Sequence, residues 1–142
     1  MASENSEPTQ KIVPYLLYSD APGAIDFLCK AFGFKECFRY PMPDGKLGHA
    51  EISYDGNIVM LASAWEEGGF SSPRDLPAVH SQIHCRVEDV DAHYERAKSA
   101  GATIAAEPAD QHGQRMYRAV DPEGHRWIFA ATSRAESKKR HR

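Results

Sequence analysis

The sequence predicts an α+β fold made of two copies of one unit, in which a strand and a helix precede three more strands. A β-rich segment runs into a helical pattern twice, at 12–32 and at 82–101. Three short strand patterns separated by turn residues follow each helix. The interval from Gly33 to Gly56 equals that from Gly101 to Gly124. Such self-similarity at a fixed period is the signature of a duplicated supersecondary unit.

The first copy begins with a strand in 12–20 that ends at Asp20. The helix over 21–32 follows, because Ala24, Ile25, Leu28 and Phe32 recur at helical spacing. Ser19 or Asp20 is its expected N-cap, and Gly33 its expected stop. Strands over 35–41, 47–53 and 57–63 complete the unit.

The second copy repeats this order. A strand over 82–89 precedes a helix over 90–101, on which Val90, Tyr94 and Ala97 share one face and Gly101 is the stop. Strands over 103–108, 114–120 and 125–131 follow, the last after the turn at 121–124. A Gly-, Ser- and Pro-rich segment divides the copies.

We therefore expect one domain over 11–132, with module 1 at 11–63, a linker at 64–80 and module 2 at 81–132. Residues 1–10 are interpreted as a disordered polar tail and 133–142 as a solvated basic tail. A net charge of −3 argues against nucleic-acid binding, and no apolar run is long enough for a bilayer. Three widely spaced cysteines and no secretory signal indicate a cytoplasmic protein.

Neither unit can cover both faces of its own sheet, because its single helix covers one face only. Two units side by side predict a curved mixed sheet with the helices outside and a concave cleft inside. Strand alternation selects the side chains of that cleft. The apolar candidates are Val13, Tyr15, Leu17, Met60 and Ile128, and the polar ones are His49, Glu51, Gln82, His84, Arg86, Arg118 and Arg126.

The segments YSDAPGAIDFLCKAFGF, VEDVDAHYERAKSAGATI and DPEGHRWIFA, in this order, resemble the glyoxalase/bleomycin-resistance/extradiol-dioxygenase superfamily, also called vicinal oxygen chelate proteins. The resemblance covers residues 11–132 and implies paired βαβββ modules around a cleft. It also implies that metal-dependent members place ligands on the first and fourth strands of each module. Those places fall here on Val13, Met60, Gln82 and Ile128.

Only Gln82 of these four could coordinate a metal, and its amide oxygen is a weak ligand for zinc, nickel or iron, so no metal and no cofactor are expected. A rival site is left open, in which His49, Glu51 and His84 hold a metal across the cleft. The simpler interpretation pairs His49 with Glu51 by a hydrogen bond. The remaining histidines, among them His93 and His125, are interpreted as structural or solvated.

The leading hypothesis is a homodimer or monomer that binds a small, partly apolar molecule for resistance or sequestration. Its predicted ligand-binding residues are Val13, Tyr15, Met60, Trp65, Gln82, His84, Arg86, Arg118, Arg126 and Ile128. Trp65, in the linker, is a candidate lid over a planar ligand. Two alternatives stay open: an isomerase, lyase or dioxygenase that uses His49, Glu51 and His84, and an interaction domain without a ligand.

Overall fold

A computed structural model describes residues 10–132. Module 1 contains β1 (Tyr15–Tyr18), α1 (Ala21–Phe32), β2 (Lys35–Pro41), β3 (Leu47–Tyr54) and β4 (Asn57–Ser63). Module 2 contains β5 (Gln82–Arg86), α2 (Val90–Ser99), β6 (Thr103–Gln111), β7 (Gln114–Val120) and β8 (Arg126–Thr132). The predicted α+β class and the repeated order of elements are confirmed. Of the predicted tails at 1–10 and 133–142, residues 1–9 and 133–142 lie outside the described residues.

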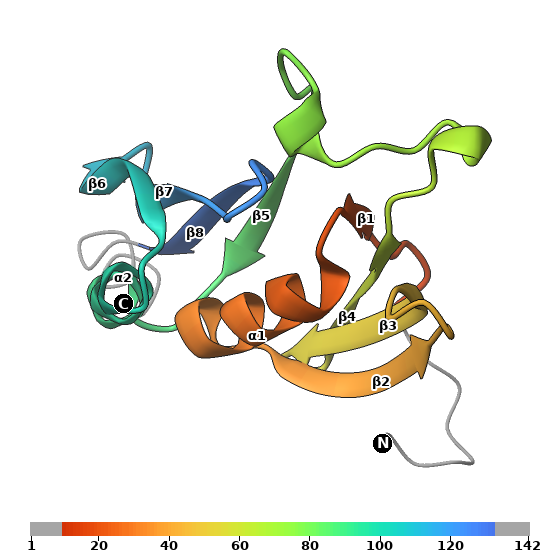
Figure 1. Cartoon of the computed structure of the whole chain (residues 1–142). Coiled ribbons are helices and arrows are strands. Elements are labelled where there is room, and N and C mark those ends of the chain that lie inside the picture. Colours follow the sequence, from red (N-terminus) through yellow and green to blue (C-terminus); the bar gives the residue numbers. More distant parts are fainter. Residues whose placement is uncertain (1–9, 133–142) are drawn as a thin grey trace.

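Each module forms its own four-stranded mixed sheet, with the order β1-β4-β3-β2 in one and β5-β8-β7-β6 in the other. The first strand of each module pairs in parallel with the last, and the other pairs are antiparallel. The two sheets lie at either side of the helices (Figure 1). Strands β1 and β5 are edge strands, so the two sheets are not joined by hydrogen bonds into one.

Helix α1 begins where its sequence predicts. Asp20 is the N-cap, and its carboxylate accepts from the backbone N–H of Gly23. Gly33 ends the helix at a φ of +84°, a conformation that costs glycine little. The buried residues of α1 follow helical spacing and pack on the inner face of the first sheet; they are Ala21, Ala24, Ile25, Leu28, Ala31 and Phe32.

Helix α2 has the same type of N-cap, because Asp89 accepts from the backbone N–H of Ala92. Its buried side chains include His93 beside the predicted Val90, Tyr94 and Ala97. Helix α2 is shorter than predicted and ends at Ser99, before Gly101. Among residues 10–132, no helix is both long and apolar enough to cross a membrane.

The two modules meet through an aromatic core. The ring of Phe32, at the end of α1, lies 4.7 Å from that of Phe129 and 5.5 Å from that of Trp127, both on β8. His93 joins this core and hydrogen-bonds to the backbone carbonyl of Phe32 at 2.8 Å. Since α1 and α2 also contact each other here, both helices lie at the junction of the modules. The predicted outer placement of the helices is therefore not confirmed, and the concave cleft stays a prediction.

The linker is fastened to module 2 by a buried carboxylate. Glu123, in the turn between β7 and β8, accepts from the hydroxyl of Ser72 and from the backbone N–H groups of Ser19 and Asp20. Arg74 lies 3.3 Å from the same carboxylate. Glu123 and Ser72 are both buried. The linker also contains two short 3₁₀ helices, Glu66–Gly68 and Pro73–Asp75.

Candidate functional site

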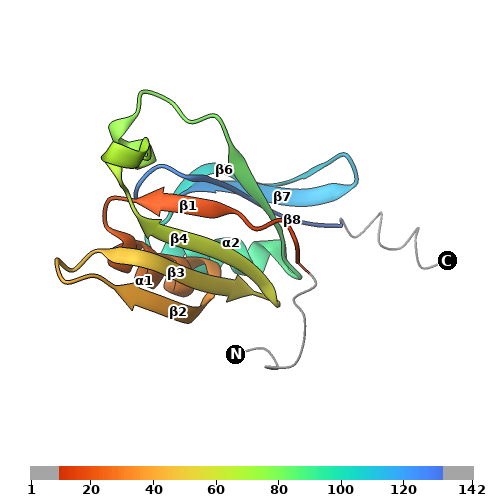
Figure 2. The same ribbon diagram turned by 90° about the vertical axis from the view of Figure 1, so that its right-hand side faces the viewer.

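The face of the first sheet that α1 leaves uncovered carries a mixed polar and apolar cluster. Tyr15 on β1, Met60 on β4 and Glu51 on β3 lie side by side across three strands. Their neighbours in sequence, such as Leu61 and Ile52, are fully buried on the opposite side, against the core. Figure 2 looks onto this uncovered face, with the helices behind it. We call it the open face of module 1.

Three polar groups on this open face form a continuous chain of hydrogen bonds. The Tyr15 hydroxyl lies 2.7 Å from Nδ1 of His49, and Nε2 of His49 lies 2.9 Å from the Glu51 carboxylate. The hydrogen-bonded pair of His49 and Glu51 considered from the sequence is thus present. Partial burial, and then the negative charge of Glu51, raise the pKa of Tyr15 above its ordinary value. The hydroxyl of Tyr15 therefore stays protonated at neutral pH.

Two aromatic residues of β2 extend this open face and were not predicted as site residues. Phe38 pairs with Glu51 and Tyr40 pairs with His49 in the β2–β3 ladder. The Phe38 ring lies 6.1 Å from the ring of His49. The side chains of Phe38 and Tyr40 are 48% and 58% exposed, which is high for aromatic residues. Their period-two spacing in the sequence indicates that both side chains lie on one face of β2, but it does not indicate which face of the sheet that is.

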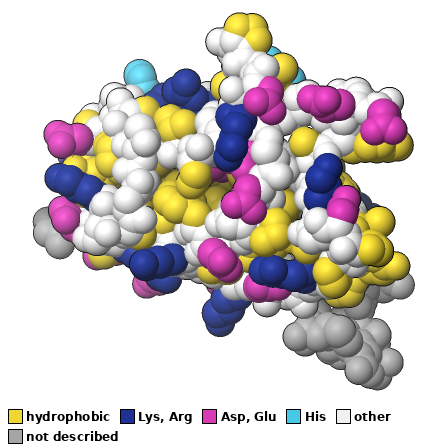
Figure 3. All heavy atoms as spheres, in the orientation of Figure 1, with side chains coloured by type: hydrophobic (Ala, Val, Ile, Leu, Met, Phe, Trp, Pro, Cys, Tyr) yellow, Lys and Arg dark blue, Asp and Glu magenta, His cyan; other side chains and the backbone are white. Residues whose placement is uncertain are grey.

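The exposed apolar surface continues to the end of the β2–β3 hairpin, where Met42 is 42% exposed. Figure 3 shows apolar side chains gathered at this end of the molecule. Tyr15, on the same open face, is 46% exposed. A soluble chain exposes single apolar residues routinely, whereas a contiguous group of this kind marks a surface that contacts another molecule.

The corresponding face of module 2 has a different chemistry. Ile128 on β8 lies between His84 on β5 and Arg118 on β7. Gln82 and Arg126 form the next pair on the same face. The side-chain amide oxygen of Gln82 accepts a hydrogen bond from the Arg118 guanidinium at 3.4 Å. Ile128 is nearly buried, whereas the four polar residues around it are exposed. This open face of module 2 is cationic at its rim and apolar at its centre.

The structure does not bring the two predicted halves of the site together within one chain. Tyr15, Met60, His49 and Glu51 belong to the first sheet, whereas Gln82, His84, Arg118, Arg126 and Ile128 belong to the second. Val13 itself precedes β1 and is half-buried. Between residues 10 and 132, there is no group of three or more His, Cys, Asp or Glu side chains arranged to hold a metal ion. His49, Glu51 and His84 thus do not form a metal site in a single chain.

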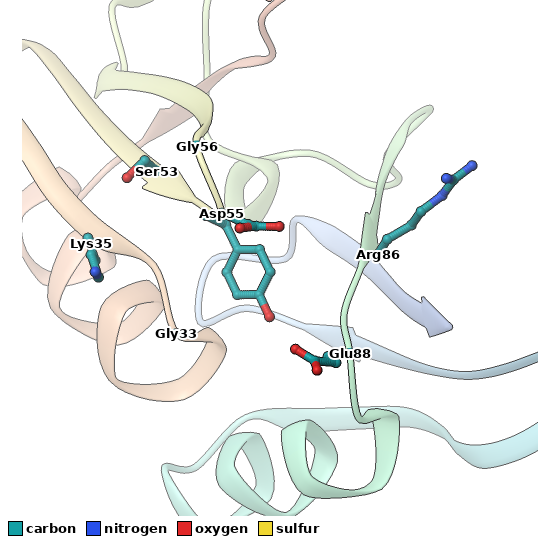
Figure 4. A pocket seen from close by; sticks show the side chains of 8 residues that line it. Gly33, Lys35, Ser53, Asp55, Gly56, Arg86 and Glu88 are labelled. Atoms are coloured by element: carbon teal, nitrogen blue, oxygen red, sulfur yellow. The ribbon is translucent and has the colours of Figure 1, made fainter. Parts of the chain in front are cut away.

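Arg86, at the end of β5, lies at the seam between the modules. A polar depression of about 510 Å³ opens there, with Lys35, Ser53 and Asp55 on one side and Arg86 and Glu88 on the other (Figure 4). A second groove, of about 520 Å³, runs along the seam past His84. Neither of the two is lined by Tyr15, Met60 or Ile128. The groove along the seam thus meets the open face of module 2 at His84 but does not include Ile128.

Trp65, the predicted lid residue, lies in a small turn of the linker. Its backbone forms an isolated antiparallel bridge with Phe70, and its ring packs on Gly68, where any side chain would collide with it. Trp65 is 59% exposed and Phe70 is 49% exposed. The turn follows directly after β4. The backbone N–H of Ala64, which precedes Trp65, donates to the backbone carbonyl of Tyr18 on β1. Its place is thus next to the sheet of module 1.

Residues 11–129 match the family model described as Glyoxalase/Bleomycin resistance protein/Dioxygenase superfamily. The chain belongs to this family, as its duplicated modules indicate. It is 43% identical over 127 residues to the uncharacterized protein Mb0911c of Mycobacterium bovis, which covers 87% of this chain and 82% of that protein. The uncharacterized protein Rv0887c of Mycobacterium tuberculosis is equally similar, with 74% of its length covered.

Among solved structures, the crystal structure of TioX from Micromonospora sp. ML1 superposes with a TM-score of 0.72 at 34% identity. The match covers 87% of this chain and 99% of TioX. A fosfomycin resistance protein, FosX from Listeria monocytogenes, crystallised with Mn(II) and dihydroxypropylphosphonic acid, has a TM-score of 0.67. It covers 94% of this chain and 98% of FosX at 18% identity, so this likeness concerns the fold alone.

Proposed function

We propose that this protein binds a small, partly apolar molecule between the open face of module 1 and the open face of module 2, without a resident metal. The main support is the group of the exposed Tyr15, Phe38 and Tyr40 with the partly buried Met60, around the hydrogen-bonded His49 and Glu51. Apolar walls with a few oriented polar groups are the usual composition of a small-molecule site. The aromatic members favour a planar ligand.

A metal-free site agrees with the donor atoms on the two faces. A thioether, from Met60, lies between Tyr15 and Glu51, and a hydrocarbon, from Ile128, lies between His84 and Arg118. Neither is a ligand for the hard or borderline divalent ions that suit a site rich in oxygen and nitrogen. Both ring nitrogens of His49 are already hydrogen-bonded. These residues do not fit a resident metal ion.

In the proposed assembly, a second copy of the chain closes the site, so that module 2 of one copy faces module 1 of the other. Charge complementarity supports this arrangement, since the face of module 1 carries Glu51 and the face of module 2 carries Arg118 and Arg126. Both edge strands, β1 and β5, have one unpaired side within the described chain. The homodimer is testable by its mass in solution.

Sequestration of a toxic compound is the role we propose for this binding. The family description includes bleomycin resistance, and FosX is a fosfomycin resistance protein. We place the protein in the cytoplasm, where its free cysteines Cys29, Cys37 and Cys85 would stay reduced. These assignments extend the binding proposal and depend on it.

A ligand screen tests the proposal. We expect planar aromatic drugs to raise the melting temperature, because a ligand at 100 times its Kd stabilises the native state by about 2.7 kcal/mol. Met60→Glu should abolish the shift, and Glu95→Ala, on the exposed side of α2, should leave it unchanged. Stoichiometric zinc, iron or nickel in the purified protein, lost on His49→Ala, would contradict the metal-free site.

A further inference from the structure

Binding alone does not require the chain of hydrogen bonds that crosses the open face of module 1. A ligand-binding surface needs donors and acceptors that point outward, yet Tyr15, His49 and Glu51 are directed at one another. The three side chains come from β1 and β3, on either side of β4, so the sheet register holds them in place. An ordered series of hydroxyl, imidazole and carboxylate is the arrangement that activates a hydroxyl in enzymes.

The chemistry of the carboxylate fixes the direction of the chain. An ionised carboxylate only accepts hydrogen bonds, so Nε2 of His49 carries a hydrogen and donates it to Glu51. In the neutral ring, Nδ1 then has a free electron pair and accepts from the Tyr15 hydroxyl. His49 is thereby positioned as a base for the proton of Tyr15, and Glu51 as the group that orients His49.

The three hydrogen-bonded residues differ in solvent exposure. A nucleophile must be accessible to the incoming molecule, whereas its base and the orienting carboxylate need not be. The side chains of His49 and Glu51 are 29% and 30% exposed, whereas Tyr15 is 46% exposed. Tyr15 is therefore the most exposed residue of the three. Its raised pKa means that a free tyrosinate is scarce, so that the oxygen becomes reactive only when His49 removes its proton.

We propose that Tyr15 is a base-assisted nucleophile and that the open face of module 1 is a site of covalent modification by aromatic electrophiles. The Tyr15 oxygen forms a bond to the electrophilic sulfur or carbon while the bond to the leaving group breaks, and the leaving group departs with the bonding electron pair. The Tyr15 proton passes to Nδ1 of His49, and Glu51 stabilises the imidazolium. Only the docking of the electrophile, through Phe38 and Tyr40, rests on the proposed function.

Benzenesulfonyl fluoride is the probe for this inference, because its ring suits the aromatic face and fluoride is its leaving group. The product is a sulfonate ester of tyrosine, located by peptide mass spectrometry. Tyr40 is an internal control on the same face. It is more exposed than Tyr15, and within residues 10–132 no hydrogen bond joins it to a base. We expect Tyr15 to be labelled at least about tenfold faster than Tyr40, since general bases contribute about 10² or more.

Two substitutions test the relay itself. His49→Gln and Glu51→Gln should lower the labelling rate of Tyr15 toward that of Tyr40, and Glu95→Gln should not. A purely structural role for the pair would leave the ratio of Tyr15 to Tyr40 labelling unchanged in folded variants. That result, or equal labelling of the two tyrosines in the unsubstituted protein, overturns the inference. If His49→Gln fails to fold, Glu51→Gln and the internal comparison decide.

The outcomes separate this inference from the proposed function. Selective labelling of Tyr15, together with a ligand screen that finds no stabilising compound, would reject the binding function and keep the activated tyrosine. Ligand binding with unselective labelling would reject the activated tyrosine and keep the binding function.

Discussion

The two modules share one strand order but use their polar residues in opposite ways. In module 2, Asp121, Glu123 and His93 are buried, and each bonds to a group of module 1. In module 1, His49 and Glu51 lie on the open face and bond to each other. The duplicated backbone thus carries buried polar groups at the junction of the modules in module 2, whereas the pair of His49 and Glu51 in module 1 lies on an open face.

Burial explains why this difference has energetic consequences. When a buried carboxylate loses its donors, it cannot hydrogen-bond to water instead. The same holds for buried donors that lose their carboxylate. An exposed polar group can do so at little cost. We therefore expect large losses of stability from substitutions in the buried polar groups of module 2, and small losses from substitutions on the open face of module 1.

The largest effect is expected for Glu123→Ala. The substitution leaves Ser72 and the backbone N–H groups of Ser19 and Asp20 without their acceptor. We expect the free energy of unfolding to fall by about 3–5 kcal/mol, as for other broken buried networks. Urea denaturation measures it. In the control Asp55→Asn, in the exposed β3–β4 turn of module 1, the free energy of unfolding should change by no more than about 0.5 kcal/mol. Equal losses in the two variants would refute the contrast between buried and exposed polar groups.

Tyr18→Phe should have the next largest effect. The Tyr18 hydroxyl donates to the Asp121 carboxylate at 2.6 Å, and both residues are buried. A hydrogen bond to a charged group contributes about 1.5–3 kcal/mol, so a loss of this size is expected. A double-mutant cycle with Asp121→Asn should show coupling between the two residues. Additive losses would mean that this contact does not join the modules.

Acid should weaken the junction through His93. Burial lowers the pKa of this imidazole below its ordinary value of about 6.5, although the carbonyl of Phe32 partly opposes the shift. The unfolded chain then binds a proton that the folded chain excludes, so stability is complete above about pH 6.5. It declines as the pH falls from there toward the lowered pKa. The free energy of unfolding, measured as a function of pH, should decline less below about pH 6.5 in His93→Gln than in the unsubstituted protein. An unchanged pH dependence would assign the acid sensitivity to other groups.

The smallest effect on stability is expected for Tyr15→Phe, on the open face of module 1. Among residues 10–132 its hydroxyl bonds to His49 alone, at a half-exposed position, so the free energy of unfolding should change by no more than about 0.5 kcal/mol. Thermal unfolding gives the value. A loss comparable to that of Tyr18→Phe would show that the open face also has a structural role, and would weaken the contrast between the modules.

The sequence predicts the elements well because its local signals agree with one another. Asp20 and Gly33 mark both ends of α1, and strand alternation separates Met60 and Ile128 from the core residues beside them. The proposed roles of these side chains in a ligand site remain predictions. Local signals of this kind operate over a few residues, so they do not report where distant segments meet.

Three features of the structure exceed what such signals reveal. A register shift between Glu36 and Phe38 sets the pairing that brings the aromatic residues of β2 beside His49. Glu123 is part of a turn whose carboxylates are ordinarily solvated, but here it is buried against Ser72 of the linker and the backbone of Ser19 and Asp20. His93 is buried because the second module's helix packs against the end of α1. Each depends on contacts between residues far apart in the chain.

The clamp on Ser72 has a consequence for the motion of the linker. By holding the segment 64–80 near its middle, Glu123 divides one long loop into two short spans. The entropy of a chain segment between fixed ends decreases as the segment shortens. The segment that carries Trp65 is therefore held at two points, the end of β4 and Ser72, and its conformational freedom is correspondingly small.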